Sequence, residues 1–182
     1  YGLLWMEKKV IRKTKNIVIT GAESSGKTTL FKDLKSLTGF RFLPEFSRIY
    51  INQINRPYDY NDILEIAKLY EKELEIASKN KLSIILDTDL LTLLIWCEYK
   101  YDKCHSFIKE SLTKNPPDFY LLCSPNIPWE FDSQRENPNN RVELFNIYLK
   151  KIMELGIDFE IIEGDLYKRL NQAKKILQNL QF

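Results

Sequence analysis

The chain has 182 residues, a formal net charge of +2 and 44% hydrophobic residues, which predicts one soluble globular domain with a sizeable core. Lys plus Arg total 27 and Asp plus Glu total 25, and this near balance argues against bulk binding of nucleic acid or of a membrane surface. No apolar run approaches the ~20 residues that a membrane-spanning helix needs. A local basic pocket for one phosphate-bearing ligand stays possible, and the three cysteines, odd in number, indicate a cytoplasmic protein in a reducing compartment.

The start of the chain is interpreted as an N-terminal extension over residues 1–15. Its hydrophobic residues precede its basic cluster, which is the wrong order for a signal peptide. Either Met6 is the native start and five residues were added before it, or the sequence is a fragment of a longer protein. These alternatives stay open.

The chain then alternates between segments typical of strands and of helices. The predicted strands cover 16–20, 41–44, 82–87, 117–123 and 158–164. The predicted helices cover 26–38, 62–80, 90–100, 141–155 and 166–180. This alternation predicts an α/β domain over 16–182, with a parallel sheet covered on both faces.

The cysteines and the single histidine predict no metal or nucleophilic chemistry. Cys97 and Cys123 lie in apolar runs, where a thiol behaves as a small hydrophobic group, and Cys104 has no metal-like spacing to them. His105 is the only histidine, so a histidine-based triad or a zinc site is not expected.

A phosphate-binding motif follows the first predicted strand and opens the first predicted helix. Residues 21–28, GAESSGKT, fit the pattern G-x-x-x-x-G-K-[ST]. The glycines let backbone N–H groups turn towards phosphate oxygens, and the helix N-terminus adds further donors. Lys27 is expected to reach the terminal phosphates of a nucleotide, and the Thr28 hydroxyl to bind Mg²⁺.

Two aspartates follow the predicted strand at 82–87, at the sheet edge where ligands bind in this architecture. Asp87 is expected to hold Mg²⁺, directly or through water. Asp89 is a candidate to bind or deprotonate an acceptor hydroxyl, and an equally plain interpretation is the N-cap of the next helix.

The irregular segment 124–141 separates a small-molecule kinase from the other phosphate-loop proteins. A GTPase would carry N-K-x-D late in the chain, whereas NKLS at 80–83 is the nearest string. A kinase needs a mobile, cationic lid that excludes water, and this segment supplies Arg135 and Arg141. Solvated surface arginines are the alternative.

Several strings together resemble the ribosylnicotinamide kinase domain of NadR-type NAD-salvage proteins, which are P-loop kinases. These strings are GAESSGKTTL, PEFSRIYI, LDTDLLTLLIW, LLCSPNIPWEFDSQRENP and IIEGDLYKR. The resemblance implies a three-layer P-loop kinase fold with a five-stranded parallel sheet. It also implies phosphorylation of nicotinamide riboside to its mononucleotide with ATP and Mg²⁺.

The resemblance also implies roles for individual residues. Nucleotide binding falls on Gly21, Ala22, Glu23, Ser24, Ser25, Gly26, Lys27, Thr28, Thr29, Arg135 and Arg141. Acceptor binding falls on Glu45, Arg48, Asp89, Trp129 and Asp132, with Mg²⁺ on Thr28 and Asp87. Catalysis falls on Lys27, Asp87, Asp89, Glu45 and Arg135.

Alternatives remain for several of these residues. Either Glu45 or Asp89 is the base; Glu45 would otherwise be a solvated residue at a helix start. Trp129 either stacks on the pyridinium ring or anchors the lid. By fold analogy, the adenine pocket is expected near residues 165–169.

The function that we infer from the sequence is therefore an ATP-dependent kinase for nicotinamide riboside. The alternatives are a P-loop kinase for another nucleoside and a non-catalytic nucleotide-binding module. The sequence leaves the oligomeric state and the choice between ATP and GTP open.

Overall fold

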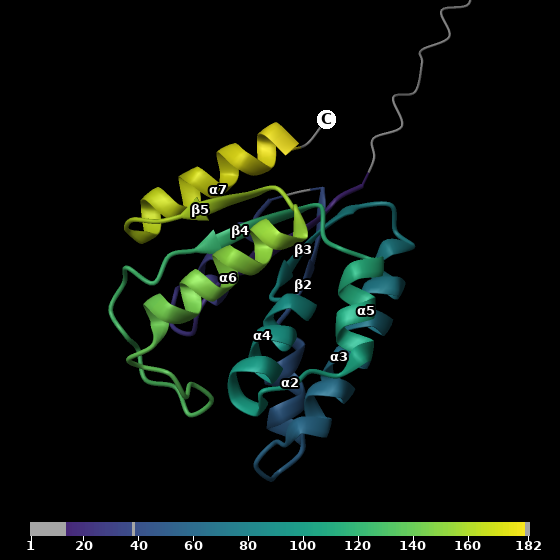
Figure 1. Ribbon diagram of the computed structural model, residues 1–182. Helices are drawn as coiled ribbons and strands as arrows, with labels where there is room; N and C mark the ends of the chain where they lie inside the picture. The colour runs from purple at the N-terminus through teal and green to yellow at the C-terminus, as the bar shows by residue number, and fades with distance from the viewer. Residues whose placement is uncertain (1–13, 38, 181–182) are drawn as a thin grey trace, which may run out of the picture.

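Five parallel strands form one sheet in the order β2-β3-β1-β4-β5 in the computed structural model, which describes residues 14–37 and 39–180 (Figure 1). The strands are β1 (Asn16–Thr20), β2 (Phe40–Leu43), β3 (Ser83–Asp87), β4 (Phe119–Cys123) and β5 (Phe159–Ile162). β1 lies at the centre, where Ile17 pairs with Ile85 of β3 on one side and with Phe119 of β4 on the other. The carboxyl ends of all five strands therefore meet at one edge.

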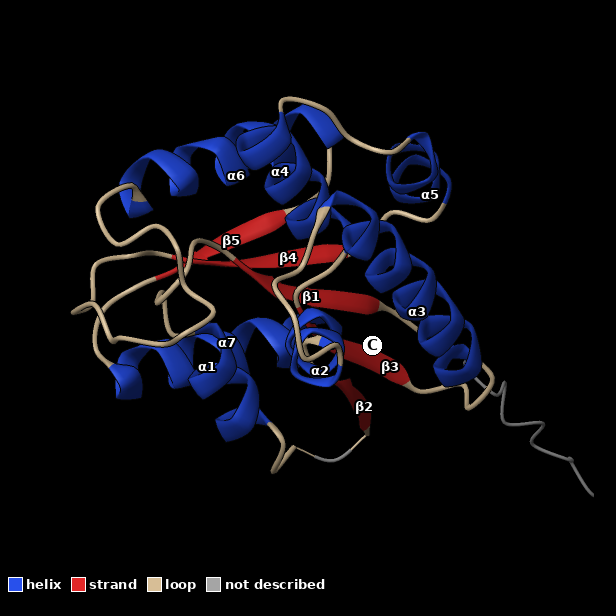
Figure 2. Cartoon of the chain, turned by 90° about the horizontal axis from the view of Figure 1, so that it is seen from below, coloured by secondary structure: helices blue, strands red, loops and turns tan. Residues whose placement is uncertain are grey.

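Helices cover both faces of the sheet. In the described part of the chain they are α1 (Lys27–Leu34), α2 (Phe46–Gln53), α3 (Tyr60–Ser78), α4 (Leu90–Tyr101), α5 (Ser106–Lys114), α6 (Arg141–Leu155) and α7 (Leu166–Leu180). Figure 2 shows α3, α4, α5 and α6 along one face, and α1 and α7 along the opposite face. The short helix α2 packs against α3. This arrangement is the predicted three-layer α/β fold.

The alternation of side chains along each strand divides the core in two. Ile17 and Ile19 pack with α1 and α7, whereas Val18 between them packs with the helices of the other face. Successive side chains of a strand point to opposite faces, and a sheet covered on both faces needs apolar residues at every position. This requirement explains why the three central strands, β1, β3 and β4, are mostly apolar.

The predicted strands are confirmed, and the helix prediction was incomplete. The sequence analysis contained no helix over α2 or α5. α2 is only eight residues long, which is shorter than the window over which a helical pattern can be recognised. α5 begins after His105, whose side chain makes no capping hydrogen bond, so the usual signal for a helix start is absent there.

Two further expectations can be compared with the described residues, and a third lies outside them. Cys97 and Cys123 are buried and unpaired, as expected for packing residues. Within residues 14–37 and 39–180, no helix combines the length and the hydropathy needed to cross a bilayer. Residues 1–13 of the predicted N-terminal extension lie outside the described residues.

A buried carboxylate connects α2 to the start of α3. Asp62 is 3% exposed and accepts hydrogen bonds from Tyr50 of α2 and from both terminal nitrogens of Arg56. It also accepts from the Asp59 amide, completing a capping box at the N-terminus of α3. These bonds, led by those from Arg56, lower the pKa of Asp62 to about 2.

This network predicts how stability depends on pH. Because the pKa of Asp62 is lower in the folded chain than its usual 3.8, its contribution is present above pH 3.8 and is lost as the pH falls through about 2. We expect Asp62→Asn to lower the free energy of unfolding by about 2 kcal/mol at pH 7. Urea denaturation at several pH values measures this difference. A difference between the two proteins that stays constant down to pH 2 would contradict the assignment.

Candidate functional site

The loop between β1 and α1 has a backbone that only glycine permits at its two ends. Gly21 has a φ of 135°, and a Cβ atom there would lie 2.7 Å from the Cys123 carbonyl oxygen. Gly26 has a φ of 82° and is the N-cap of α1, with no side-chain capping bond. The N-terminal amides of α1 therefore keep donors for an anion.

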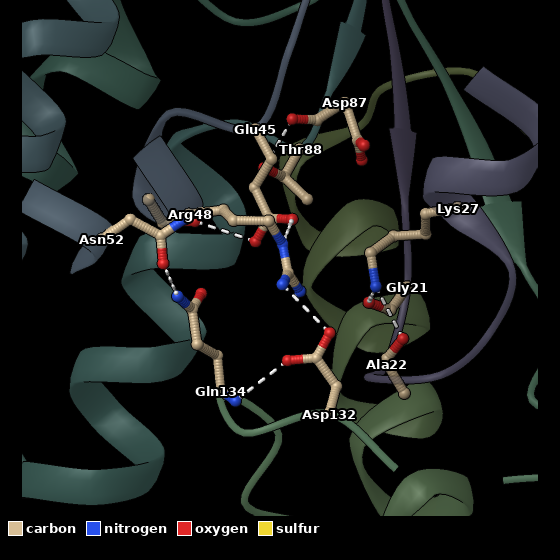
Figure 3. Close-up of polar contacts among 11 residues, drawn as sticks. Gly21, Ala22, Lys27, Glu45, Arg48, Asn52, Asp87, Thr88, Asp132 and Gln134 are labelled. Carbon is tan, nitrogen blue, oxygen red and sulfur yellow. Dashed lines mark hydrogen bonds and ion pairs between the residues drawn. The ribbon is translucent and has the colours of Figure 1, made fainter. Parts of the chain in front are cut away.

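The charge of Lys27 lies over this loop. Its ammonium group donates hydrogen bonds to the Gly21 carbonyl at 2.9 Å and to the Ala22 carbonyl at 2.7 Å (Figure 3). Both acceptors are neutral carbonyl oxygens, and a phosphate oxygen is a stronger, charged acceptor for an ammonium group. The arrangement holds a cation at the place where the motif predicts phosphates.

Two buried polar atoms of the site have no hydrogen-bond partner among the described residues: Ser25 Oγ and Asp87 Oδ1. Such orphaned groups are rare in folded proteins and call for an explanation. Burial, followed by repulsion from Glu45, raises the pKa of Asp87 to about 6, while Lys27 and the Thr28 hydroxyl oppose the shift. A buried carboxylate oxygen beside a threonine hydroxyl fits the donor set that Mg²⁺ uses next to phosphates.

Asp89 is fully engaged in local structure. It is the N-cap of α4, accepting from the Leu91 amide, and its other oxygen accepts from the Tyr120 hydroxyl at 2.6 Å. Burial raises its pKa to about 6, opposed by the hydrogen bonds that it accepts. Of the two interpretations of Asp89, the N-cap is the one observed.

A chain of charges leads from the start of α2 to segment 124–140. The Glu45 carboxylate accepts from the Ser47 hydroxyl and pairs with Arg48 at 3.4 Å. Arg48 pairs in turn with Asp132 at 3.0 Å, and Figure 3 shows its guanidinium between the two carboxylates. The backbone amide of Gln134, together with Arg48, lowers the pKa of Asp132.

Segment 124–140, which we call the lid, has no helix or strand and is docked on the phosphate-binding loop. The Glu23 carboxylate accepts from the amides of Glu136 and Asn137 at 2.9 and 2.8 Å. The Ser24 hydroxyl accepts from the Glu130 amide at 2.9 Å. Two residues of the loop thus hold the lid through its backbone.

The two predicted arginines approach the same loop. Arg135 donates to the Ser24 hydroxyl and to the Glu130 carbonyl, and Arg141, the first residue of α6, donates to the carbonyls of Ser24 and Ile127. The Trp129 ring lies 6.0 Å from the Arg135 guanidinium and 5.8 Å from that of Arg141. Such cation–π contacts favour Trp129 as an anchor for the lid.

Loop, α2, α4 and lid enclose a cavity of about 180 Å³. Its lining includes residues 21–29 and Arg135. It also includes Glu45, Arg48, Ile51, Trp96, Tyr99 and Tyr148, a set that we call the inner compartment. The site thus joins a phosphate-binding end to an aromatic end that carries one carboxylate and one guanidinium.

The structure brings together most of the residues predicted for the site. Residues 21–29, Glu45, Arg48 and Arg135 line the cavity, whereas Asp87, Asp89, Trp129, Asp132 and Arg141 do not. The sequence analysis missed Trp96 and Tyr99. Their positions on α4, three residues apart and preceded by Thr92 of the same lining, form a stripe at helical spacing that was the available signal.

Arg169, at the edge of the region expected to bind adenine, is buried and holds several chain segments together by hydrogen bonds. It is 2% exposed and donates to the carbonyls of Gly164, Ser25 and Ser124 and to the side-chain oxygen of Asn126, at 2.6–2.8 Å. It therefore connects α7, the phosphate-binding loop and the end of β4.

The raised pKa of Asp87 predicts a stabilising substitution. A carboxylate whose pKa rises on folding destabilises the protein as the pH increases from about 3.8 through about 6. We expect Asp87→Asn, without metal or nucleotide, to raise the free energy of unfolding at pH 8 by about 1–3 kcal/mol. Urea denaturation measures the difference, which should shrink at pH 4. An equal difference at both pH values would contradict the explanation.

The comparisons with solved structures show the fold. A NadR protein in complex with NR matches with a TM-score of 0.78 at 20% identity, over 93% of this chain and 52% of that one. A NadR protein in complex with NAD and AMP-PNP matches with a TM-score of 0.75 at 17% identity, over 93% and 50%. Thymidylate kinase from Candida albicans matches with a TM-score of 0.64 at 15% identity, over 92% of both chains. The fold is that of a P-loop kinase.

The sequence comparisons point in the same direction. The trifunctional NAD biosynthesis/regulator protein NadR of Escherichia coli K12 is 28% identical over 163 residues, which is 84% of this chain and 39% of that protein. The Salmonella typhimurium protein of the same name is 25% identical over 175 residues, 91% of this chain and 42% of that one. This chain spans about two fifths of the length of these relatives.

A family profile covers most of the chain. The profile of the AAA domain family (AAA_28) matches residues 16–169, from the first strand to the buried arginine of α7. The matched range includes the phosphate-binding loop, the end of β3 and the whole lid. The chain therefore belongs to this family of AAA domains.

Proposed function

We propose that this protein transfers the γ-phosphoryl group of ATP to the ribose 5′-hydroxyl of nicotinamide riboside. The observation that carries the proposal is one cavity that joins the phosphate-binding loop to an aromatic compartment beneath the lid. The NadR likeness in sequence and fold supports the choice of acceptor. The likeness in fold to thymidylate kinase supports phosphoryl transfer as the type of reaction, without regard to the acceptor.

The inner compartment has the chemistry that a cationic nucleoside requires. Trp96 and Tyr99 offer flat aromatic surface to a pyridinium ring. Glu45 offers a carboxylate to the positive ring or to the ribose hydroxyls. Arg48 pairs both with this carboxylate and with Asp132 of the lid, and so holds Glu45 in place.

In the proposed reaction, the acceptor oxygen attacks the γ-phosphorus, the bond to the bridging β–γ oxygen breaks, and ADP leaves. Glu45 accepts the hydroxyl proton, because its carboxylate lines the cavity, whereas Asp89 is buried outside the cavity lining and caps α4. Lys27 and Arg135 stabilise the negative charge on the transferred group. Thr28 and Asp87 are the residues that would hold Mg²⁺, which supplies further charge neutralisation when bound.

The acceptor test is ADP release with Mg·ATP and a panel of nucleosides. We expect release that depends on nicotinamide riboside, with nicotinamide mononucleotide as the product identified by mass spectrometry. ADP release with a different nucleoside would show that the protein is a kinase for another acceptor. Tight ATP binding without release for any acceptor would favour a non-catalytic nucleotide-binding module.

The ranking of two variants tests the mechanism. Because the transition state of phosphoryl transfer is loose, its stabilisation depends mainly on cations, and Lys27→Ala should lower kcat/KM by ~10³-fold. Asp89→Asn should lower it by less than ~10-fold, since the Asn side chain can also cap a helix. Steady-state kinetics measures both variants after circular dichroism has shown that they fold. The reverse ranking would count against the mechanism.

A further inference from the structure

One side chain of the lid belongs to a hydrogen-bonded network that reaches the inner compartment. The Glu136 carboxylate accepts from the Tyr58 hydroxyl at 2.9 Å and pairs with Lys100 at 3.0 Å. The Tyr58 hydroxyl also accepts from the indole N–H of Trp96 at 2.9 Å and from Lys100. Tyr58 lies between α2 and α3, whereas Trp96 and Lys100 lie on α4.

The backbone of the same lid residue is bound to the phosphate-binding loop. The Glu136 amide donates to the Glu23 carboxylate at 2.9 Å. A continuous series of hydrogen bonds therefore runs from Glu23 through Glu136 and Tyr58 to Trp96, whose ring lines the inner compartment. Glu23 itself lines the phosphate-binding end of the cavity.

We propose that Tyr58 and Glu136 are positioning residues that couple lid closure over the nucleotide to the orientation of Trp96 in the acceptor compartment. When the lid is docked, Glu136 fixes the Tyr58 hydroxyl, which in turn fixes the indole. When the lid opens, Tyr58 loses its acceptor and the Trp96 ring loses one of its constraints. A bound nucleotide that keeps the lid docked therefore increases the affinity for the acceptor, and a bound acceptor increases the affinity for the nucleotide by the same factor.

Ring contacts and protonation support this assignment. The Tyr58 and Trp96 rings meet edge to face with centroids 4.7 Å apart, and the Lys100 ammonium lies 4.2 Å from the Tyr58 centroid. Burial and the neighbouring Glu136 carboxylate raise the pKa of Tyr58, so the phenol keeps the proton that it donates.

The strength of the network suits a reversible contact. The side chains of Lys100 and Glu136 are 34% and 44% exposed, and an ion pair of that exposure contributes little by itself. Neutral hydrogen bonds such as those of Tyr58 are also individually modest. The lid can therefore open to release the reaction product without breaking a buried charge pair at Glu136.

The proposal rests on the proposed function only for the identity of the acceptor. Its test compares Tyr58→Phe, Glu136→Ala and the double variant with the unmodified protein. The matched control is Glu65→Ala, which removes a carboxylate from an exposed pair with Lys68 on α3.

Calorimetry measures the dissociation constant of nicotinamide riboside with and without AMP-PNP. We expect AMP-PNP to tighten binding of the riboside by ~10-fold in the unmodified protein and by less than ~3-fold in Tyr58→Phe and Glu136→Ala. The double variant should match the worse single variant, because Glu136 acts through Tyr58. Unchanged coupling in either single variant, or additive losses in the double variant, would overturn the proposal.

A second readout keeps this test separate from the acceptor assignment. If the riboside does not bind, hydrogen exchange of the lid amides is followed with AMP-PNP alone. We expect faster exchange over 130–140 in Tyr58→Phe and Glu136→Ala, and no change in Glu65→Ala. Equal exchange rates in all variants would overturn the proposal. If the riboside does not bind but the exchange rates differ as expected, only the assignment of nicotinamide riboside as the acceptor is overturned.

Discussion

The buried guanidinium of Arg169 is the constraint on which the geometry of the site depends. It donates to oxygens from three segments that meet at the carboxyl edge of the sheet: the phosphate-binding loop, the end of β4 and the loop before α7. Each acceptor is a neutral carbonyl or amide oxygen, so the charge is solvated by the backbone. A buried cation that is held in this way fixes three chain segments relative to one another, because losing any of these bonds leaves a charged group unsatisfied.

With the loop fixed, the lid completes the site through two kinds of contact. Its backbone docks on Glu23 and Ser24, and its side chains reach α2 through Asp132 and α4 through Glu136. The lid therefore lies over the cavity while most of its contacts remain half-exposed. Exposed contacts of this kind are individually weak, which suits the proposed role of the segment as a lid that opens and closes.

Much of the fold was predictable because it follows from local patterns. Mostly apolar segments predicted the five strands, and the spacing of Gly21, Gly26 and Lys27 predicted the phosphate-binding loop. Arg169 was not predictable as a structural residue, because its partners are three backbone oxygens and one side-chain oxygen that lie 5–144 positions away in the chain. The role of Tyr58 was not predictable for the same reason, since its partners Trp96 and Glu136 approach it only in the folded chain.

The proposed chemistry requires that the loop binds a triphosphate while the lid stays docked over it. The decisive measurement is a titration of the protein with Mg·AMP-PNP, followed by the chemical shifts of its backbone amides. We expect the largest shifts on residues 22–28, with saturable changes at the lid amides of Glu136 and Asn137. Saturable shifts confined to other elements, with the loop amides unchanged, would contradict it.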